Sequence, residues 1–562
     1  MTHSEFKPRV IVVGAGPVGL ALAADLGWRG VPTLLVDKGT GEVPQPKTSG
    51  VNIRTMEYCR RWGLRARIRA HGMAKDYPRD RVWVTSLNGY ELARQTAPSL
   101  ADDVAPRGAL ETFMRIHQTE FDPILRDYAL KCPSVRAMYL TQCVGVTQDD
   151  EGVTAELIDV PTGARSVARA DYIVSCEGAG SVIRKSIGIE LAGNWNVNHS
   201  TNAYFRSNEF LSAHDKGRAL FYNVVGPEGS CGYLFAVNGT DLWQAQILGI
   251  NGEKATASRE EVADVIRRFV GRDFAFDLLD VTPWTRRRLL ADRYRIGRVF
   301  LAGDAIHQMP PSGTLGMNTG VADATNLSWK LEAMLAGWGG AGLLDSYQAE
   351  RRPVAERNAE AAVAMFQSGR MKAPPGPAIL DDGDEGARVR AATGARLLAH
   401  ATHPPTEGMQ IGYRYEDSPI CLPGDMPSPP SDYQHYRPTT YPGARAPDGY
   451  LDGNPILDRF GRGFVLVRVG ARPPDCDGLV AAAAACGVPL TQLDVGGPDL
   501  EELYERRLVL VRPDGHVAWR GDAPPADPRM VIDVVRGARP VQPQAVAESR
   551  FAQTSDEPNV PI

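Results

Sequence analysis

The chain has 562 residues, 43% of them hydrophobic, which is enough apolar material for about three to four domain-sized units. Its formal net charge of −5 gives no broad basic field for nucleic acid or an anionic membrane, and no apolar stretch is long enough to span a bilayer. The eight cysteines form no Cys-x-x-Cys pair and the first residues are polar, so we expect a cytoplasmic protein without a signal peptide, disulfide scaffold or metal site.

The first predicted element is a buried parallel strand that leads into a glycine-rich turn. The apolar run Val10–Val13 precedes the turn GAGPVG (14–19), which opens a helix. Gly14 permits the tight turn, Gly16 lets the backbone approach a pyrophosphate, and Gly19 lets helix and strand pack closely. Phosphates bind well at such a helix N-terminus, so the turn predicts a dinucleotide cofactor.

The second predicted strand ends in an acidic residue. Thr33–Val36 is followed by Asp37, at about the spacing from the first glycine where a carboxylate accepts hydrogen bonds from a ribose. The residues of this part that we expect to bind the cofactor are Gly14, Gly16, Pro17, Val18, Gly19, Asp37 and Lys38.

The pattern of strands and helices predicts several structural blocks. Strands alternating with helices indicate one doubly wound α/β domain interrupted by inserts, and alternating apolar and polar residues indicate a mostly antiparallel sheet with one solvent-facing side. A segment rich in Pro, Gly and Asp is expected to be a largely irregular linker, and a small α/β domain and a polar tail follow it. The expected boundaries are 1–81, 110–185 and 289–370 for the first domain, 82–109 and 186–288 for the sheet, 371–440 for the linker, 441–545 for the C-terminal domain and 546–562 for the tail.

A second motif, GDAIHQMPPSGTLGMNTG (303–320), is predicted to hold a flavin. Asp304 follows an apolar strand, so its carboxylate emerges at the carboxyl end of the sheet, where ligands of such folds bind. Prolines stiffen the next turn, glycines let the backbone approach a flat ring, and a helix from about Met317 points its amides at the ring edge. The residues expected to bind FAD here are Gly303, Asp304, Pro311, Gly313, Gly316, Met317 and Asn318.

Taken together, the motifs resemble the group A FAD-dependent aromatic monooxygenases, the family of phenol hydroxylase, chlorophenol hydroxylases and polyketide aromatic hydroxylases. Further similar segments are KTSGVNIRTMEYCRRWGL (47–64), IHQTEFDPIL (116–125), DYIVSCEGAGSVIRKSIGI (171–189) and LLDSYQAERRPVAERN (343–358). The resemblance implies a glutathione-reductase-like FAD domain and a thioredoxin-like C-terminal domain, whose clearest mark is LVLVRPDGHVAWR. That domain lacks a redox cysteine pair, so we expect it to be structural or an oligomer contact, and a homodimer is a family-level expectation.

The segment CEGAGSVIR (176–184) resembles the family's second fingerprint, which touches both the FAD pyrophosphate and the nicotinamide cofactor. Glu177 stands where the family has an aspartate, and its longer side chain puts the handling of NADPH in doubt. The resemblance assigns Glu177, Gly178 and Arg184 to this side of the site. A purely structural pairing of Arg184 remains an alternative.

The resemblance also implies that Asp304 holds the ribityl chain, that Lys47 lies near the FAD phosphates and that Gln118 lies on the adenosine side. A solvated loop lysine and a surface glutamine are the alternatives for Lys47 and Gln118. His307 is expected to pack under the flavin loop.

The family resemblance implies that NAD(P)H and O2 are used to hydroxylate a phenolic or polycyclic aromatic substrate through a flavin C4a-hydroperoxide. Of the two nucleotides, we expect NADPH. Such chemistry requires a closed, mostly apolar cavity and a base or hydrogen-bond chain to a phenol. The base is not identified. Candidates on the inner face of the sheet, each also readable as a core or surface residue, are Tyr204, Arg206, Tyr222, Tyr233, Trp243 and Gln246.

Two other functions remain open at this point. A flavin dehydrogenase or disulfide reductase is disfavoured because no Cys-x-x-Cys and no second Gly-x-Gly-x-x-Gly domain is present. A non-catalytic FAD-binding regulator or complex subunit is suggested by the extra C-terminal domain and by Glu177.

Overall fold

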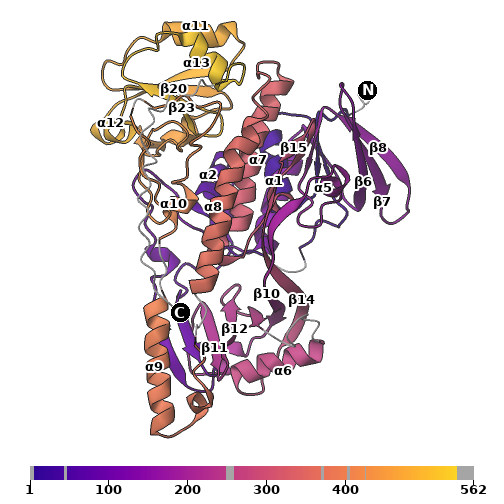
Figure 1. The fold of residues 1–562 in the computed structure, drawn as a ribbon, viewed down its shortest axis with the longest axis vertical. Helices are drawn as coiled ribbons and strands as arrows, with labels where there is room; N and C mark the ends of the chain where they lie inside the picture. Colours follow the sequence, from indigo (N-terminus) through magenta and orange to yellow (C-terminus); the bar gives the residue numbers. More distant parts are fainter. Residues whose placement is uncertain are drawn as a thin grey trace, which may run out of the picture.

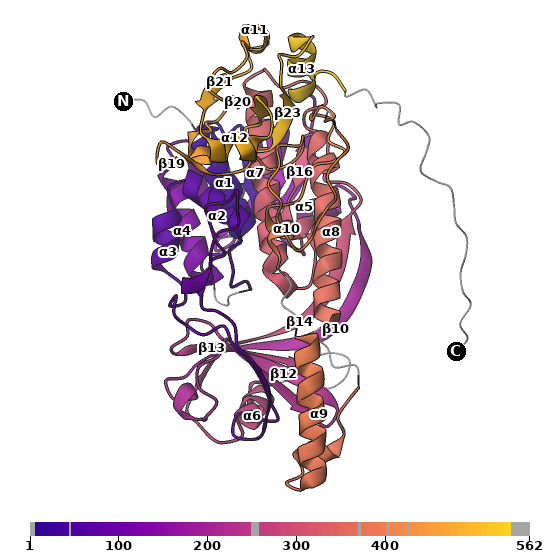
Figure 2. The same ribbon diagram turned by 90° about the vertical axis from the view of Figure 1, so that its left-hand side faces the viewer.

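The structure is a computed structural model, which describes residues 6–43, 47–248, 258–368, 373–401, 405–424 and 426–540. Figures 1 and 2 show three regions stacked along the long axis, with a central α/β domain between the C-terminal domain and a large sheet. Among the described helices, none is both long and apolar enough to cross a membrane.

The central domain is built on a six-stranded sheet in the order β15-β16-β9-β1-β2-β5. The strands run parallel except β15, which pairs antiparallel with β16. Both faces of β1 and β9 are buried, as expected for a parallel sheet covered on two sides. The strands are β1 (Val10–Val13), β2 (Thr33–Val36), β5 (Val135–Met138), β9 (Tyr172–Ser175), β15 (Arg295–Ile296) and β16 (Val299–Leu301).

Helices α1, α4 and α7 pack side by side in this domain, and α2 and α8 lie against α7. Their bounds are α1 (Pro17–Trp28), α2 (Ile53–Arg61), α4 (Gln118–Lys131), α7 (Leu315–Leu335) and α8 (Ser346–Ser368). The short helices α3 (Arg65–Ala70) and α5 (Val182–Ser186) complete it.

Part of segment 110–185 differs from the expected alternation of strands and helices. It contains a three-stranded antiparallel sheet of β6 (Thr141–Gln148), β7 (Val153–Asp159) and β8 (Arg165–Ala170). Apolar residues of β7 join the same core as β1 and α1. The small sheet is therefore packed into the central domain, because its apolar face needs the central sheet to cover it.

The large sheet has eight strands in the order β17-β14-β10-β13-β12-β11-β3-β4, and its pairs are antiparallel except β11 with β3. One face forms a core with α6 (Arg259–Val270), whose N-terminus is closed by a capping box between Ser258 and Glu261. The strands are β3 (Arg81–Val84), β4 (Glu91–Gln95), β10 (Leu191–Arg206), β11 (Phe221–Gly226), β12 (Gly229–Ala236), β13 (Leu242–Leu248), β14 (Asp277–Ala291) and β17 (His307–Gln308).

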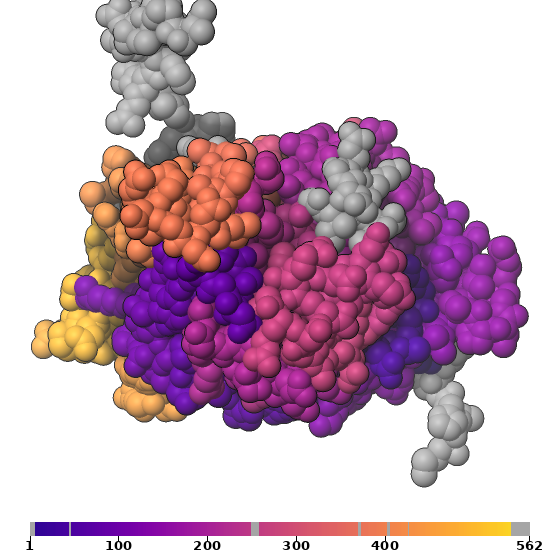
Figure 3. Space-filling model, turned by 90° about the horizontal axis from the view of Figure 1, so that it is seen from below, coloured from indigo at the N-terminus to yellow at the C-terminus, as the bar shows by residue number. Residues whose placement is uncertain are grey.

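The segment expected to be a largely irregular linker contains a long helix, α9 (Asp384–His400), and the short α10 (Glu407–Gln410). The expectation was wrong for α9, which packs on the edge strand β4 and covers Trp83 and Ala93 together with Ile379. Figure 3 shows α9 in orange beside the β3–β4 hairpin in purple. Packing on the sheet edge stabilises α9, and this tertiary contact cannot be predicted from the segment's own Gly- and Ala-rich sequence.

The C-terminal domain has a four-stranded sheet in the order β21-β20-β22-β23, which lies within the range 441–545 expected for this domain. Its elements are β18 (Tyr450–Leu451), β19 (Asn454–Pro455), β20 (Phe464–Val469), α11 (Asp477–Ala485), β21 (Leu490–Val495), α12 (Pro498–Tyr504), β22 (Leu508–Val511), β23 (Val517–Gly521) and α13 (Pro528–Val535). Cys476 and Cys486 are both free thiols.

Candidate active site

The glycine-rich turn has the geometry that a phosphate cradle needs. Gly14 has φ +104°, and a Cβ added there would lie 2.4 Å from the carbonyl oxygen of Cys176. A Cβ on Gly19 would lie 1.8 Å from the carbonyl oxygen of Gly14, so only glycine lets α1 pack this closely. A Cβ on Gly16 would meet no atom within 4 Å, and no side chain caps α1. The backbone at Gly16 is therefore open to a phosphate, as FAD requires.

Val18 joins the two motifs that the sequence places almost 290 residues apart. Val18 Cγ2 would lie only 2.9 Å from a Cβ added to Gly303 and 2.5 Å from a Cβ added to Gly320, so both glycines are needed for this close packing. The turn after β1 and the turn after β16 consequently lie side by side at the carboxyl end of the sheet.

The Asp37 carboxylate lies at the end of β2 and binds the backbone of the glycine-rich turn. Its Oδ2 accepts from the Ala15 amide at 2.6 Å and its Oδ1 accepts from the Gly39 amide at 2.7 Å. A carboxylate has further lone pairs, so binding a ribose remains compatible with these contacts. Lys38 is exposed.

Lys47 and Gln118 lie together, although 71 residues separate them in the sequence. The Lys47 amide donates to Gln118 Oε1 at 3.2 Å, and Gln118 Nε2 donates to Asp122 Oδ2 at 3.0 Å. Asp122 is buried, and burial raises its pKa to about 7. Sequence reasoning missed Asp122, although its position one helical turn after Gln118 on α4 was the available signal.

Asp304 lies in a one-turn 3-10 helix directly after β16. Its side chain is accessible to solvent, and the protein atoms that surround part of it raise its pKa against the opposing positive charges of His307 and Lys47. An accessible carboxylate at this position can accept hydrogen bonds from the hydroxyls of a ribityl chain.

His307 is fully buried under this turn, as expected. Its Nε2 lies 2.7 Å from Asp323 Oδ2, and Arg351 Nε donates to the other oxygen of Asp323 at 2.8 Å. These charges hold the pKa of Asp323 below its usual range. The triplet ties the flavin turn to α7 and α8, and sequence reasoning did not find Asp323 or Arg351.

The loop before α7 has unusual backbone conformations. Gly313 has φ +73° and Thr314, a non-glycine, has φ +56°. A Cβ added to Gly316 would lie 3.6 Å from Met309 Cγ, which is an ordinary contact distance. Pro311 and Met317 are partly buried. No side chain caps the start of α7, so its first amides are free to face an anionic ring edge.

Asn318 binds protein backbone through its side-chain amide. Its Nδ2 donates to the carbonyls of Thr314 at 2.7 Å and Gly50 at 3.2 Å, and its Oδ1 accepts from the Asn52 amide at 3.0 Å. Asn318 therefore holds the segment before α2 against α7.

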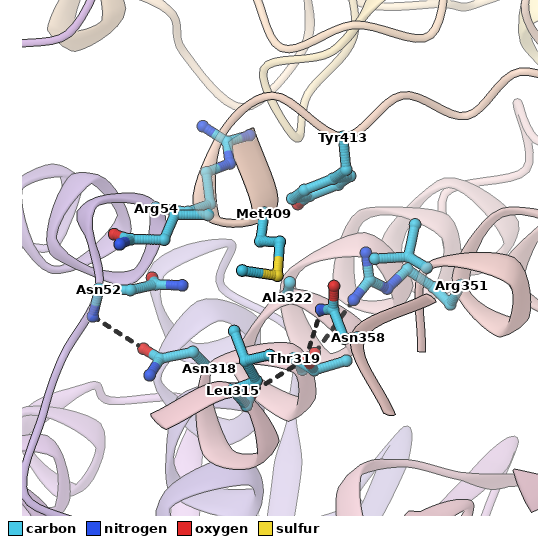
Figure 4. Close-up of a pocket in the computed structure, with 12 residues that line it drawn as sticks. Asn52, Arg54, Leu315, Asn318, Thr319, Ala322, Arg351, Asn358, Met409 and Tyr413 are labelled. Carbon is cyan, nitrogen blue, oxygen red and sulfur yellow. Dashed lines mark hydrogen bonds between the residues drawn. The ribbon is translucent and has the colours of Figure 1, made fainter. Parts of the chain in front are cut away.

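On the other side of this contact, Figure 4 shows a small polar cavity with Tyr413 and Met409 above the N-terminal turns of α7. Gln410 Oε1 accepts from the Ile53 amide at 3.0 Å, so α10 helps to cap α2. The cavity is lined by Asn318, which was expected to bind FAD, and by residues of the supporting helices α2, α8 and α10.

Glu177 caps the short helix α5. Its Oε2 accepts from the hydroxyls of Ser175 at 2.8 Å and Ser181 at 2.7 Å and from the amide of Ile183 at 3.1 Å. The Glu177 side chain, which is one methylene longer than that of aspartate, therefore reaches hydrogen-bond donors of the protein itself. Gly178 has φ +77° and nothing within 4 Å of an added Cβ, so the backbone here is open to a ligand.

Arg184 joins the second fingerprint to the flavin turn. Its Nη1 donates to the carbonyls of Ala179 at 3.1 Å and Ala305 at 3.4 Å. Burial lowers the pKa of Arg184. These contacts hold the protein backbone, and the assignment of Arg184 to the cofactor side of the site stays a prediction.

The large sheet divides the six candidate substrate residues between its two faces. Trp243 and Tyr222 lie in the core with α6, where Trp243 Nε1 donates to the Ser207 carbonyl and the Tyr222 hydroxyl donates to the Gly217 carbonyl. The expectation that they share the inner face was wrong. Arg206 is exposed and pairs with Asp241 at 3.0 Å.

Tyr204, Tyr233 and Gln246 lie on the opposite face, which looks toward the central domain. Gln246 Nε2 donates to Asn202 Oδ1 at 2.9 Å, and Gln246 Oε1 accepts from Arg286. The Arg286 guanidinium lies 4.7 Å from the ring centre of Phe366 on α8. Figure 2 shows this sheet directly beneath the central domain. The arrangement therefore places an aromatic and polar surface below the flavin motifs.

The chain matches two protein families. Residues 7–362 match the family described as FAD binding domain, and residues 439–538 match the family described as aromatic-ring hydroxylase, C-terminal. An FAD-dependent monooxygenase of Emericella nidulans is 32% identical over 93% of this chain and 89% of its own length. Tetracenomycin B2 monooxygenase-dioxygenase of Streptomyces olivaceus is 32% identical over 94% of this chain and 97% of its own length.

Solved structures give the same result for the fold. The rebeccamycin biosynthetic enzyme RebC with reduced flavin has a TM-score of 0.85 at 34% identity, covering 95% of this chain and 99% of that one. Aklavinone-11 hydroxylase, solved with FAD and aklavinone, has a TM-score of 0.77 at 29% identity, covering 95% of this chain and 99% of that one.

Proposed function

The chain belongs to the family of FAD-dependent aromatic-ring hydroxylases, and on this premise we propose that it hydroxylates a phenolic or polycyclic aromatic substrate bound on the large sheet. FAD, when bound and reduced, supplies the activation of O2. The observation that carries the proposal is the placement of Tyr204, Tyr233 and Gln246 on the sheet face below the motifs that hold FAD.

The protein's own residues would bind and orient both molecules. The open backbone at Gly16 and the free amides of α1 fit the pyrophosphate, and the accessible Asp304 carboxylate fits the ribityl hydroxyls. The uncapped start of α7 fits an electron-rich ring edge. Phe221 and Phe235, which lie beside Tyr233 on the sheet, provide an apolar surface that would exclude water from the reacting ring.

A polycyclic ring system is favoured over a single phenol ring. Tetracenomycin B2 monooxygenase-dioxygenase and a putative polyketide hydroxylase of Streptomyces halstedii are each 32% identical to this chain, whereas a phenol 2-monooxygenase of Pseudomonas is 27% identical. The sheet face presents several aromatic residues in adjacent strands, which suits an extended planar ligand.

The decisive experiment measures NADPH oxidation by the FAD-loaded protein with a panel of phenols and polycyclic phenols, with product analysis by mass spectrometry. We expect at least one aromatic compound to accelerate NADPH oxidation and to gain one oxygen atom. If every aromatic compound leaves the rate unchanged and unmodified substrate is recovered, the proposal fails.

We also propose NADPH over NADH as reductant and a cytoplasmic homodimer as the working form. Support comes from the family resemblance and from eight cysteines without a Cys-x-x-Cys pair. Comparison of the flavin reduction rates with the two nucleotides tests the first point. Sedimentation equilibrium of the FAD-loaded protein tests the second.

A further inference from the structure

The sheet face below the central domain carries two guanidinium groups beside one phenol. Arg81 on β3 and Arg286 on β14 both lie close enough to Tyr233 for their charges to lower its pKa against the effect of burial. Tyr233 remains partly accessible to solvent. The phenol and the two cations therefore lie close together on a sheet face where Tyr233 and Arg81 are partly accessible to solvent.

Arg81 differs from the arginines around it. Arg79 pairs with Asp103 at 2.7 Å, and Arg94 pairs with Glu91 at 2.9 Å. The Arg81 side chain forms no hydrogen bond or ion pair in the part of the chain that the structure describes, and its Nε is buried without a partner. Burial without a nearby carboxylate lowers the pKa of Arg81.

Aromatic rings take the place of a counter-ion. The Arg81 guanidinium lies 5.3 Å from the ring centre of Phe221 and 5.8 Å from that of Trp83. Such contacts orient the planar group and leave its N–H donors available. A buried cation normally has a charged partner, so this arrangement is explained most simply if the ligand brings one.

We propose that Arg81 is the specificity residue for a carboxylate on the aromatic substrate, with the substrate ring lying along Phe221 and Tyr233. This inference rests on the proposed function and narrows it to aromatic carboxylic acids. A guanidinium donates two parallel hydrogen bonds to a carboxylate, and these bonds are stronger than those it forms with a neutral carboxamide.

The test uses the FAD-loaded protein and two ligands of the same shape, anthraquinone-2-carboxylate and anthraquinone-2-carboxamide, with flavin absorbance as the readout of binding. We expect the native protein to bind the carboxylate about tenfold or more tightly than the amide. Arg81→Met should weaken the carboxylate by about 10- to 100-fold and leave the amide within about threefold, whereas Arg81→Lys should keep part of the preference.

Arg169→Met is the matched control, because Arg169 lies exposed on β8 and pairs with Asp149. It should leave both affinities unchanged. If Arg81→Met does not retain FAD, Arg81→Gln and Arg81→Lys provide the comparison. The proposal is overturned if the native protein does not prefer the carboxylate or if the preference survives in every Arg81 variant. NADPH oxidation measured with neutral phenols distinguishes this failure from failure of the hydroxylase function. The hydroxylase function fails only if no aromatic compound accelerates NADPH oxidation.

Discussion

Arg512 and Glu350 form two parallel hydrogen bonds between the C-terminal domain and α8. Arg512 Nη1 donates to Glu350 Oε1 and Nη2 donates to Oε2 at 2.9 Å, with both side chains fully buried. Glu350 also accepts from Lys330 of α7 at 2.7 Å, and the backbone carbonyl of Asp514 accepts from Arg54 of α2. The turn between β22 and β23 is thus held against the helices that support the flavin site, which gives the C-terminal domain a structural role.

Arg512→Met should destabilise the protein by about 3–5 kcal/mol, because it leaves Glu350 buried with one charged partner fewer. We expect a weaker affinity for FAD as well, since α7 loses its support. Urea unfolding and FAD titration measure the two effects. Arg468→Met is the control: Arg468 lies on β20 of the same domain and pairs with the largely exposed Asp494, so about 0–1 kcal/mol is expected. Equal effects of the two substitutions would contradict the structural role of the turn.

The glycine-rich turn offers a substitution that separates folding from cofactor binding. Gly16→Ala adds a methyl group into open space, so the thermal stability of the apoprotein should change little. The same methyl group would occupy the approach of the pyrophosphate, so the affinity for FAD should fall by about tenfold or more. Gly19→Ala should instead destabilise the apoprotein, because its Cβ would collide with Gly14. Gly461→Ala, also in open space but in the C-terminal domain, should alter neither quantity.

Local chemistry made the cofactor motifs predictable from the sequence. The strand, glycine spacing and terminal acid around Gly14 and Asp37 each have a physical cause within a few residues. The same is true of Asp304, which follows directly after a buried strand. The residues that bind substrate were harder to predict from the sequence, because their positions depend on how distant strands pair.

The candidate substrate residues show what the sequence could predict about the large sheet and what it could not. Trp243 and Gln246 are three positions apart on one strand, so the period of two already places them on opposite faces. Tyr222 and Tyr233 belong to different strands, and only the register between β11 and β12, which pairs Tyr222 with Leu234, shows that they face apart. The contact of Arg512 with Glu350 joins residues 162 apart and has no local signal at all.

Glu177 gives a test of the residue that departs from the family pattern. Its carboxylate accepts from two serine hydroxyls and the start of α5, so Glu177→Ala should cost about 1–2 kcal/mol of stability. Glu177→Gln keeps acceptor atoms and should cost less. Rapid mixing with NADPH compares flavin reduction in the two variants. If Glu177→Ala unfolds at the same urea concentration as the native protein, the cap contributes nothing to stability.

Asp122 should make stability depend on pH near neutrality. The folded protein keeps the Asp122 proton up to about pH 7, because the carboxyl group is buried, whereas the unfolded chain loses it near pH 4. Between these values the folded state binds more protons than the unfolded state, so stability falls as pH rises, by at most about 1.4 kcal/mol per pH unit.

Asp122→Asn cannot ionise and still accepts the hydrogen bond from Gln118, so the variant should be more stable than the native protein at pH 8, with the difference shrinking toward pH 5. The positive charges of Lys47 and Arg126 oppose the effect and limit its size. Urea unfolding at pH 5, 6, 7 and 8 measures the difference, which cancels the titration of all other groups. Asp127→Asn is the control, because Asp127 lies on the same helix but has a side chain that is 45% exposed and pairs with Arg67. A native-minus-variant difference for Asp122→Asn that is constant across this range would show that the carboxyl group is ionised throughout.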